Sequence, residues 1–286
     1  MTTKKLSVTI GISALNEEEN IGKMLSSLLI QEEKNFTIEK ILVISDGSTD
    51  GTVNVVRSFN NPKICVIASK KNLGRAYRSN QLMRLCKTDL LVILDSDISF
   101  YNKNTLAKVV KPFYENRKVA LVSGNTNSVG KHNFVTRSWL TSKMAYEYIR
   151  HRIKNGNNVL SCFGAMLAIA KPLHKRINIP SDIFAWDSFL YLSCLKSGHK
   201  FVNVSNAEVR HPLTTTLLGQ IKRNKRYSKS TAELKPYFGE MVDREFYIPR
   251  SLYYRGVLSQ LLKYPIHTIF IYAVNSYARL LAKYGK

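Results

Sequence analysis

Five short apolar segments, separated by segments with helical periodicity, constrain the fold of this chain more than any other feature. They are rich in Val, Ile and Leu, as strands buried on both faces are, and they cover Ser7–Ala14, Ile41–Ser45, Ile64–Ala68, Leu90–Leu94 and Ala120–Ser123. The first helical stripe between them contains Ile21, Leu25, Leu28 and Leu29. This alternation predicts an α/β fold with a mostly parallel sheet and helices on both faces, whose ligands bind beyond the carboxyl ends of the strands.

The pattern changes after Asn125, where a polar segment leads to an expected helix over Phe134–Ile153. An apolar stretch follows over residues 158–170, and a further helical pattern covers Trp186–Ser197. Because no linker rich in Pro, Gly or Ser and no internal repeat separates the two parts, we expect them to share one sheet. We therefore expect one domain over residues 1–235, with halves 6–125 and 126–235, and a basic amphipathic helical segment over 236–286.

The net charge of the chain favours anionic partners. Lys and Arg number 43 against 20 Asp and Glu, which gives a formal charge of +23 over 286 residues. Such a charge suits nucleic acid, an anionic membrane surface or phosphorylated small molecules. No helix-turn-helix, zinc-finger or RNP-like signature occurs, so nucleic acid is not an expected partner.

Two amphipathic stripes near the C-terminus have helical spacing. The first contains Tyr254, Val257, Leu258 and Leu261, and the second contains Ile266, Ile269, Phe270, Ala273, Val274, Tyr277, Leu280 and Leu281. The second stripe has a polar opposite face that includes His267 and Asn275, so a helix lying in a membrane interface fits better than a spanning helix. Periodicity leaves two interpretations open: the helices bind a membrane surface, or they pack on the core.

Four cysteines, Cys65, Cys86, Cys162 and Cys194, lie in apolar surroundings without C-x-x-C spacing. This pattern predicts buried, reduced thiols and suits a cytosolic setting. The first apolar segment is interrupted by Ser and Thr and is followed by Glu17, Glu18 and Glu19, so it is interpreted as a strand and not as a signal peptide.

Acidic residues occur where three of the predicted strands end. Glu17 follows the first strand, Asp46 and Asp50 follow the second, and Asp95-Ser96-Asp97 follows the fourth. Two carboxylates that leave a buried strand together repel each other, and a hard divalent cation such as Mg²⁺ or Mn²⁺ relieves that repulsion. The alternative is that these residues only cap helices and form turns.

These motifs, in this order and spacing, resemble the nucleotide-binding half of a family 2 glycosyltransferase of the GT-A fold. The resemblance is carried by Ser13-Ala14-Leu15-Asn16-Glu17-Glu18, Asp46-Gly47-Ser48-Thr49-Asp50-Gly51-Thr52, Lys71-Asn72-Leu73-Gly74-Arg75-Ala76 and Asp95-Ser96-Asp97. It is strong over residues 6–100 and continues more loosely to about residue 230. It implies an inverting enzyme that uses a nucleotide-diphosphate sugar.

The resemblance assigns roles to residues of the first half. Ala14, Leu15 and Glu17 would contact the nucleoside, and Asp46 would accept a hydrogen bond from a base N–H. Asn72, Gly74, Arg75 and Arg78 match the segment that closes over the nucleotide, where the arginines would contact the diphosphate. Asp97, assisted by Asp95, would hold the metal, with Ser96 beside the nucleotide. The alternative for residues 72–78 is a basic helix start, with Arg78 on a solvated face.

The second half matches the family less closely. Asp187 would be the general base, although Trp186 stands where the family usually has its first acid, and Asp182 is a second candidate base. Gly164 resembles the glycine that lines the acceptor pocket, and Trp186 is expected with it among the residues that contact acceptor or diphosphate. Gln220, Arg223 and Arg226 resemble the Q-x-x-R-W segment of polymerising members, where they would hold acceptor or diphosphate, but Asn224 replaces the Trp. The alternative for this segment is a basic amphipathic helix, and His211 is either an additional metal or phosphate ligand or a structural residue.

The expected function is metal-assisted transfer of a sugar, with a UDP-sugar as the expected donor, to a lipid-linked or polysaccharide acceptor. Mn²⁺ or Mg²⁺ is the expected cofactor, and the expected location is cytoplasmic, peripheral at the cytoplasmic face of the membrane. Two other classes remain as alternatives: a sugar nucleotidyltransferase, and a non-catalytic basic module that binds membrane or nucleic acid. The acidic segment after the first strand argues against the former, which needs a Gly-rich phosphate loop there.

Overall fold

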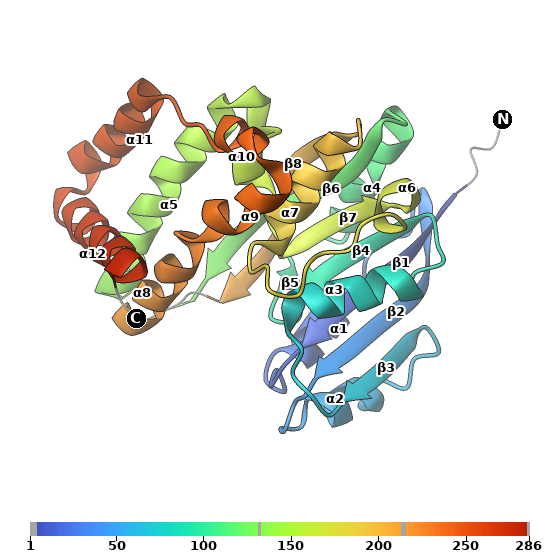
Figure 1. Ribbon diagram of the computed structural model, residues 1–286. Coiled ribbons are helices and arrows are strands. Elements are labelled where there is room, and N and C mark those ends of the chain that lie inside the picture. The colour runs from blue at the N-terminus through green and yellow to red at the C-terminus, as the bar shows by residue number, and fades with distance from the viewer. Residues whose placement is uncertain (1–4, 131–132, 213–215, 285–286) are drawn as a thin grey trace. The chain divides into compact units, whose positions relative to one another are not determined.

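The computed structural model describes residues 5–130, 133–212 and 216–284. It divides into two compact units (Figure 1). The first contains the described residues of Met1–Asn127 and Ser161–His211, and the second those of Ser128–Leu160 and Pro212–Lys286. The domain division at residue 235 stays a prediction.

Within the described residues, the first unit contains six helices and eight strands, of which β6 and β8 each end one or two residues inside the second unit. The strands are β1 (Leu6–Ala14), β2 (Phe36–Asp46), β3 (Ile64–Ser69), β4 (Leu90–Asp95), β5 (Ser99–Phe100), β6 (Val119–Val129), β7 (Met166–Ala170) and β8 (Lys200–Pro212). The helices are α1 (Ile21–Leu29), α2 (Thr52–Ser58), α3 (Gly74–Leu85), α4 (Thr105–Glu115), α6 (Lys171–His174) and α7 (Trp186–Lys196).

The strands form one sheet in the order β3-β2-β1-β4-β7-β6-β8-β5. Strands β3, β2, β1 and β4 pair in parallel, while β7 pairs antiparallel with both β4 and β6. The α/β fold class and the single sheet shared by both halves of the sequence are therefore confirmed. The strand at Ala120–Ser123 differs from the parallel pairing that the alternation predicts, because β7 from later in the chain inserts between β4 and β6.

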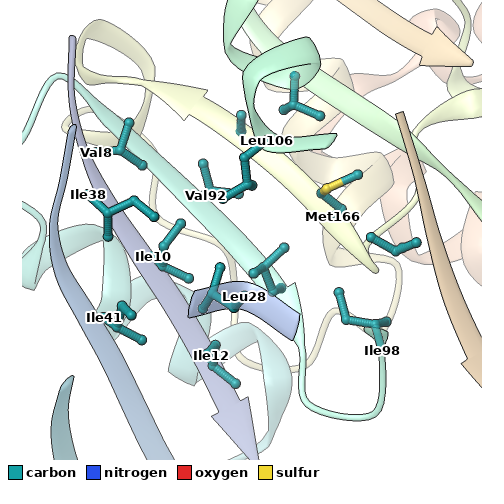
Figure 2. Close-up of a cluster of buried hydrophobic side chains, with 14 of the residues drawn as sticks. Val8, Ile10, Ile12, Leu28, Ile38, Ile41, Val92, Ile98, Leu106 and Met166 are labelled. Carbon is teal, nitrogen blue, oxygen red and sulfur yellow. The ribbon is translucent and has the colours of Figure 1, made fainter. Parts of the chain in front are cut away.

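One large cluster of buried apolar side chains in this unit lies on one face of the sheet. Figure 2 shows Val8, Ile10 and Ile12 of β1 gathered with Leu28 of α1 and Leu106 of α4. These β1 residues alternate along the strand, so they point to the same face.

Helix α3 covers the other face, where Gly11 provides the space it needs. A Cβ atom on Gly11 would lie 3.0 Å from the methyl carbons of Leu82. Because α3 lies this close to the sheet, the segment at its N-terminus reaches the carboxyl ends of β1 and β2.

The second unit is helical. It contains α5 (Phe134–Arg152), two short 3₁₀ segments (Lys154–Gly156 and Val159–Ser161), α8 (Leu217–Tyr227), α9 (Ser230–Phe238), α10 (Glu240–Glu245), α11 (Arg250–Lys263) and α12 (Pro265–Tyr284). Helices α11 and α12 pack against α5, and α12 also packs against α8 (Figure 1). No helix in the described parts of the chain is both long enough and apolar enough to cross a bilayer.

The cysteines match the expectation of reduced thiols. All four are free; three are buried, and Cys65 is partly exposed.

Candidate active site

The carboxyl ends of β1 and β2 are joined by side-chain hydrogen bonds. Asn16 adopts a left-handed conformation with φ of 54°, a conformation that Asn tolerates better than most residues. Its backbone N–H donates to the Ser48 hydroxyl at 3.1 Å, and its side-chain oxygen accepts from the Thr49 N–H at 2.9 Å. This arrangement leaves Ala14 buried and Leu15 exposed at the strand end.

Glu17 lies among other carboxylates at this edge of the sheet. Its backbone N–H donates to the Thr52 hydroxyl at 2.8 Å, and its carboxylate accepts from the Asn20 amide at 2.8 Å. Burial raises the pKa of Glu17, and the negative charges of Asp97, Asp95 and Asp50 raise it further against the effect of the Asn20 hydrogen bond. The strand-end acids of the sequence therefore gather in one place, as expected from parallel strands.

Asp46 at the end of β2 holds the start of α3. Its carboxylate accepts hydrogen bonds from the backbone N–H groups of Leu73 and Gly74 at 2.8 and 2.9 Å. The Arg78 Nε atom lies 2.6 Å from the same carboxylate, and this ion pair is almost fully buried. A carboxylate has about four lone-pair positions, so about one is left for a base N–H. The contact between Asp46 and a nucleotide base stays a prediction.

Arg78 is buried, so the alternative that placed it on a solvated face is wrong. Its guanidinium also donates to the Ser69 hydroxyl, the Lys71 carbonyl and the Gln81 side chain, at 2.6, 2.8 and 2.7 Å. These contacts make Arg78 a residue that positions Asp46 and the segment before α3. Direct contact between Arg78 and a diphosphate stays a prediction. The hydrogen bonds that Arg78 makes within the protein do not support it.

The segment before α3 lies close to the end of β2. Gly47 has φ of +86°, and a Cβ atom there would lie 2.8 Å from the Asn72 nitrogen, so glycine is required. Asn72 is exposed, and its side chain accepts from the Gly74 N–H at 3.1 Å. Gly74 itself has φ of +83° and open space around it.

Arg75 reaches the end of β4 and pairs with the first acid of the Asp95-Ser96-Asp97 motif. Its Nη2 atom lies 2.6 Å from Asp95 Oδ1, and its Nη1 donates to the Ser13 hydroxyl at 2.7 Å. Its guanidinium carbon lies 4.9 Å from the ring centre of Trp186, within the range of a cation–π contact. Ser13 was not predicted as a site residue. Its position near the carboxyl end of a buried strand could have indicated that it lies at the site.

Asp95 and Asp97 provide oxygen ligands of the type that Mg²⁺ and Mn²⁺ prefer. Burial raises the pKa of Asp95; Arg75 opposes this shift, Asp97 adds to it, and His211 lowers it. Ser96 between them is buried. Across the described residues, no group of three His, Cys, Asp or Glu side chains is placed to hold a metal ion. The two acids therefore fit a metal that takes most of its ligands from phosphate and water, and not one enclosed by protein.

Asp187, at the start of α7, is a carboxylate with a raised proton affinity. It accepts from the N–H groups of Ser188 and Gly164, at 2.7 and 3.2 Å. Burial raises its pKa from 3.8 to about 6, against these hydrogen bonds and with a further contribution from the charge of Asp95. Asp182 is exposed.

Trp186 packs directly on Gly164. A Cβ atom at position 164 would lie 2.7 Å from Trp186 Cζ2 and 3.4 Å from Asp187 Oδ2. Gly164 thus allows the indole ring and the carboxylate to approach the same backbone segment. The sequence indicated each of these residues separately, but not their contact.

The remaining predicted site residues lie on α8 in the second unit. Gln220 is buried and donates to the Asn224 side chain at 3.2 Å. The Arg223 guanidinium lies 5.4 Å from the Trp139 ring centre. The assignment of Gln220, Arg223 and Arg226 to acceptor or diphosphate binding stays a prediction.

The family model for glycosyl transferase family 2 matches residues 9–177, which is more than half of the chain and includes most of β1, all of β2 and β4, and the acids at their ends. The chain belongs to glycosyl transferase family 2. The predicted family and the predicted enzyme class are thereby confirmed.

Curated relatives of this family 2 glycosyltransferase have stated activities. It is 29% identical over 119 residues to a 4,4'-diaponeurosporenoate glycosyltransferase of Staphylococcus aureus, a match that covers 41% of this chain and 31% of the relative. It is 26% identical over 185 residues to the O-antigen chain rhamnosyltransferase WbaN of Salmonella anatum, with 60% and 56% covered. The matches thus span about a third to just over half of these relatives.

Solved structures of glycosyltransferases share the fold of this family 2 glycosyltransferase. The mannosyltransferase PcManGT of Pyrobaculum calidifontis, in complex with GDP-Man and Mn²⁺, superposes with a TM-score of 0.64 at 18% identity, covering 99% of this chain and 77% of the other. Glucosyl-3-phosphoglycerate synthase of Mycobacterium tuberculosis, in complex with Mn²⁺, UDP and phosphoglyceric acid, gives a TM-score of 0.58 at 16% identity, with 86% and 80% covered.

Proposed function

We propose that this chain is an inverting glycosyltransferase that moves a sugar from a nucleotide-diphosphate donor, with a UDP-sugar as the first candidate. One observation carries this proposal. Glu17, Asp95 and Asp97 meet at the carboxyl edge of the sheet beside Arg75, and the half-buried base Asp187 lies near enough for the charge of Asp95 to raise its pKa.

The donor would bind at this edge through its charged diphosphate. Arg75 is held by Ser13 and Asp95 and stacks on Trp186, so its guanidinium is already oriented when a phosphate arrives. Asp97 and Asp95 are the residues that would hold Mg²⁺ or Mn²⁺. The bound ion would supply positive charge that stabilises the leaving diphosphate.

Asp187 would remove the proton from the attacking acceptor hydroxyl. A pKa of about 6 leaves this carboxylate ionised at pH 7 to 8 while making it a stronger base than an ordinary Asp. The Ser188 and Gly164 N–H groups hold its two oxygens, so the base is oriented before the acceptor binds. Attack from the face opposite the diphosphate inverts the anomeric centre.

The acceptor that we propose is a lipid-linked intermediate or a growing surface polysaccharide, reached at the cytoplasmic face of a membrane. The names of the curated relatives support this class, since one is a 4,4'-diaponeurosporenoate glycosyltransferase and the other an O-antigen chain rhamnosyltransferase. The 13 basic and 4 acidic side chains of residues 211–286 support contact with an anionic membrane surface.

Calorimetric titration with UDP, GDP and CMP, with and without Mn²⁺, tests the donor site. We expect Mn²⁺-dependent binding of UDP to the wild type and its loss in Asp97→Ala. Asp243→Ala removes an exposed acid of the second unit and serves as the matched control. If the wild type binds none of the nucleotides, the proposed donor site is refuted.

A further inference from the structure

Helix α12 turns its polar face inward. The His267 ring nitrogen Nδ1 lies 2.9 Å from the Ser138 hydroxyl of α5. Asn275 accepts a hydrogen bond from Asn224 of α8 and donates to the Ser142 hydroxyl of α5 at 3.5 Å. The polar side of this amphipathic helix is therefore the side that packs, together with the buried residues Thr268, Ile271 and Ala278.

The apolar side of α12 is exposed. Its residues follow steps of three and four and are Ile266, Ile269, Ala273, Tyr277, Leu280 and Tyr284. At about 100° per residue they fall within a sector of about 80°, and at about 1.5 Å per residue they extend over about 27 Å. Except for the small Ala273, each of these side chains is more than half exposed.

Helix α11 adds a second row of the same kind. Tyr254, Leu258 and Leu262 are more than half exposed and follow one another at steps of four. The opposite side of α11 packs on α5, where a Cβ atom on Gly256 would lie 3.1 Å from the Ala145 carbonyl oxygen. The exposed apolar residues of α11 and α12 form what we name the outer face of the helix pair.

The charges on α11 and α12 have one sign. Neither helix contains an acidic residue, whereas Arg250, Arg255, Lys263, Arg279 and Lys283 lie on them. Arg279 and Lys283 border the apolar row of α12 on one side. Long basic side chains beside an apolar row can reach lipid phosphates while the row contacts acyl chains.

An open hollow of about 460 Å³ adjoins the outer face at the start of α12. It is lined by Phe134, Arg137, Tyr264, Pro265, Ile266 and His267. Ile266 belongs to both the hollow and the apolar row. The aromatic and aliphatic walls with one guanidinium suit the junction of a lipid headgroup and its chains.

We propose that the outer face of α11 and α12 lies flat on a membrane surface that contains anionic lipids. An apolar row on helices whose charged residues are all basic is the pattern of an interfacial helix, and here its inner side is already occupied by α5 and α8. A second copy of the chain would bring basic residues of two like-charged helix pairs together, which like-charge repulsion opposes. This inference depends on neither the donor nor the catalytic base of the proposed reaction.

Vesicle flotation of the full chain tests this surface. We expect binding to vesicles of phosphatidylcholine with 30% phosphatidylglycerol, weaker binding to phosphatidylcholine alone, and release by high salt. The double variant Ile266→Glu/Leu280→Glu is expected to weaken binding at least tenfold, because two charged groups would enter the interface. Ile30→Glu introduces a charge at an exposed apolar residue of the first unit and is expected to bind as the wild type does.

A second pair of variants tests the basic border. Arg279→Gln/Lys283→Gln should lose affinity for the anionic vesicles only, whereas Lys23→Gln/Lys87→Gln, with the same change in net charge, should not. Circular dichroism and thermal unfolding report whether each variant is folded. A wild type that does not float, or an Ile266→Glu/Leu280→Glu variant that floats as well as the wild type, overturns the proposal. The proposal is also overturned if light scattering shows that the wild type is a dimer and that Ile266→Glu/Leu280→Glu is a monomer. The outer face would then bind a second copy of the chain.

Discussion

Replacing Asp187 with Asn is expected to slow transfer by about 10² to 10⁴-fold and, at the same time, to stabilise the folded protein at alkaline pH. The wild-type carboxylate is held by two N–H groups, yet burial and the nearby charge of Asp95 raise its pKa from 3.8 to about 6. The free energy of unfolding is therefore smaller when Asp187 is ionised, which is the form that the proposed base requires, than when it is protonated.

The size of the stability effect follows from this pKa difference. The native state holds the proton more tightly than the unfolded chain does, so stability decreases as pH rises from about 4 to about 6 and stays lower above that. A shift of about two units corresponds to about 3 kcal/mol at about 1.4 kcal/mol per unit. Asn carries no charge but keeps only one acceptor oxygen, and the lost hydrogen bond costs about 1 kcal/mol. We expect Asp187→Asn to be about 1 to 2 kcal/mol more stable than the wild type at pH 8, with little or no gain near pH 4.

Urea denaturation at the two pH values measures this difference, and Asp243→Asn is the matched control. Asp243 is an exposed acid of the second unit with no assigned role in the reaction, so its replacement should change neither stability nor rate appreciably. The rate is followed as release of nucleoside diphosphate from a panel of sugar donors that carry the nucleotide identified by calorimetry, with a membrane extract as the source of acceptor. Loss of the base is expected to lower this rate about 10² to 10⁴-fold. An Asp187→Asn variant that is less stable than the wild type at pH 8, or that retains wild-type turnover, would refute the reasoning.

Three further predictions concern the same site. For the wild type, kcat is expected to fall about tenfold per pH unit below about pH 6, because protonated Asp187 cannot accept the hydroxyl proton. A kcat that does not change between pH 8 and pH 5 would contradict this prediction. Arg78→Met leaves the buried Asp46 carboxylate without its cation and is expected to lower the free energy of unfolding, measured in urea, by about 3 kcal/mol. The control Arg84→Met, on an exposed part of the same helix, should change this free energy by less than about 0.5 kcal/mol. Arg75→Gln removes the oriented guanidinium and is expected to weaken UDP binding, measured by calorimetry, about tenfold, with Arg84→Gln as the control. If Arg75→Gln binds UDP as tightly as the wild type does, Arg75 is excluded from the donor site.

The gathering of the strand-end acids could be predicted from the sequence. Glu17 and Asp95 each follow a buried apolar run, and parallel neighbouring strands bring such ends to one edge. This prediction needs no three-dimensional information, because strand direction alone determines that these acids lie at the carboxyl edge of the sheet.

The surroundings of the basic residues could not be predicted in this way. An Arg on a helix is most often solvated, and the burial of Arg78 depends on Asp46, which lies 32 positions earlier in another element. Periodicity likewise showed which residues of α12 share a face, but it does not state which face packs. That choice is made by partners on α5 and α8, and here those partners are polar.

The contact between Gly164 and Trp186 restricts how these two positions can change during evolution. A methyl group at position 164 would overlap the Trp186 indole ring. The ring is rigid, so it cannot bend away as the end of a flexible side chain could. Replacement of the indole by a smaller residue, such as the acid that usually stands there in the family, would make room for that methyl group. The two substitutions are therefore expected to show sign epistasis, in which Ala at position 164 is harmful before the change at position 186 and tolerated after it. Lineages that carry Trp at position 186 should accordingly keep Gly at position 164, and the order of the two changes would be traceable in an ancestral reconstruction.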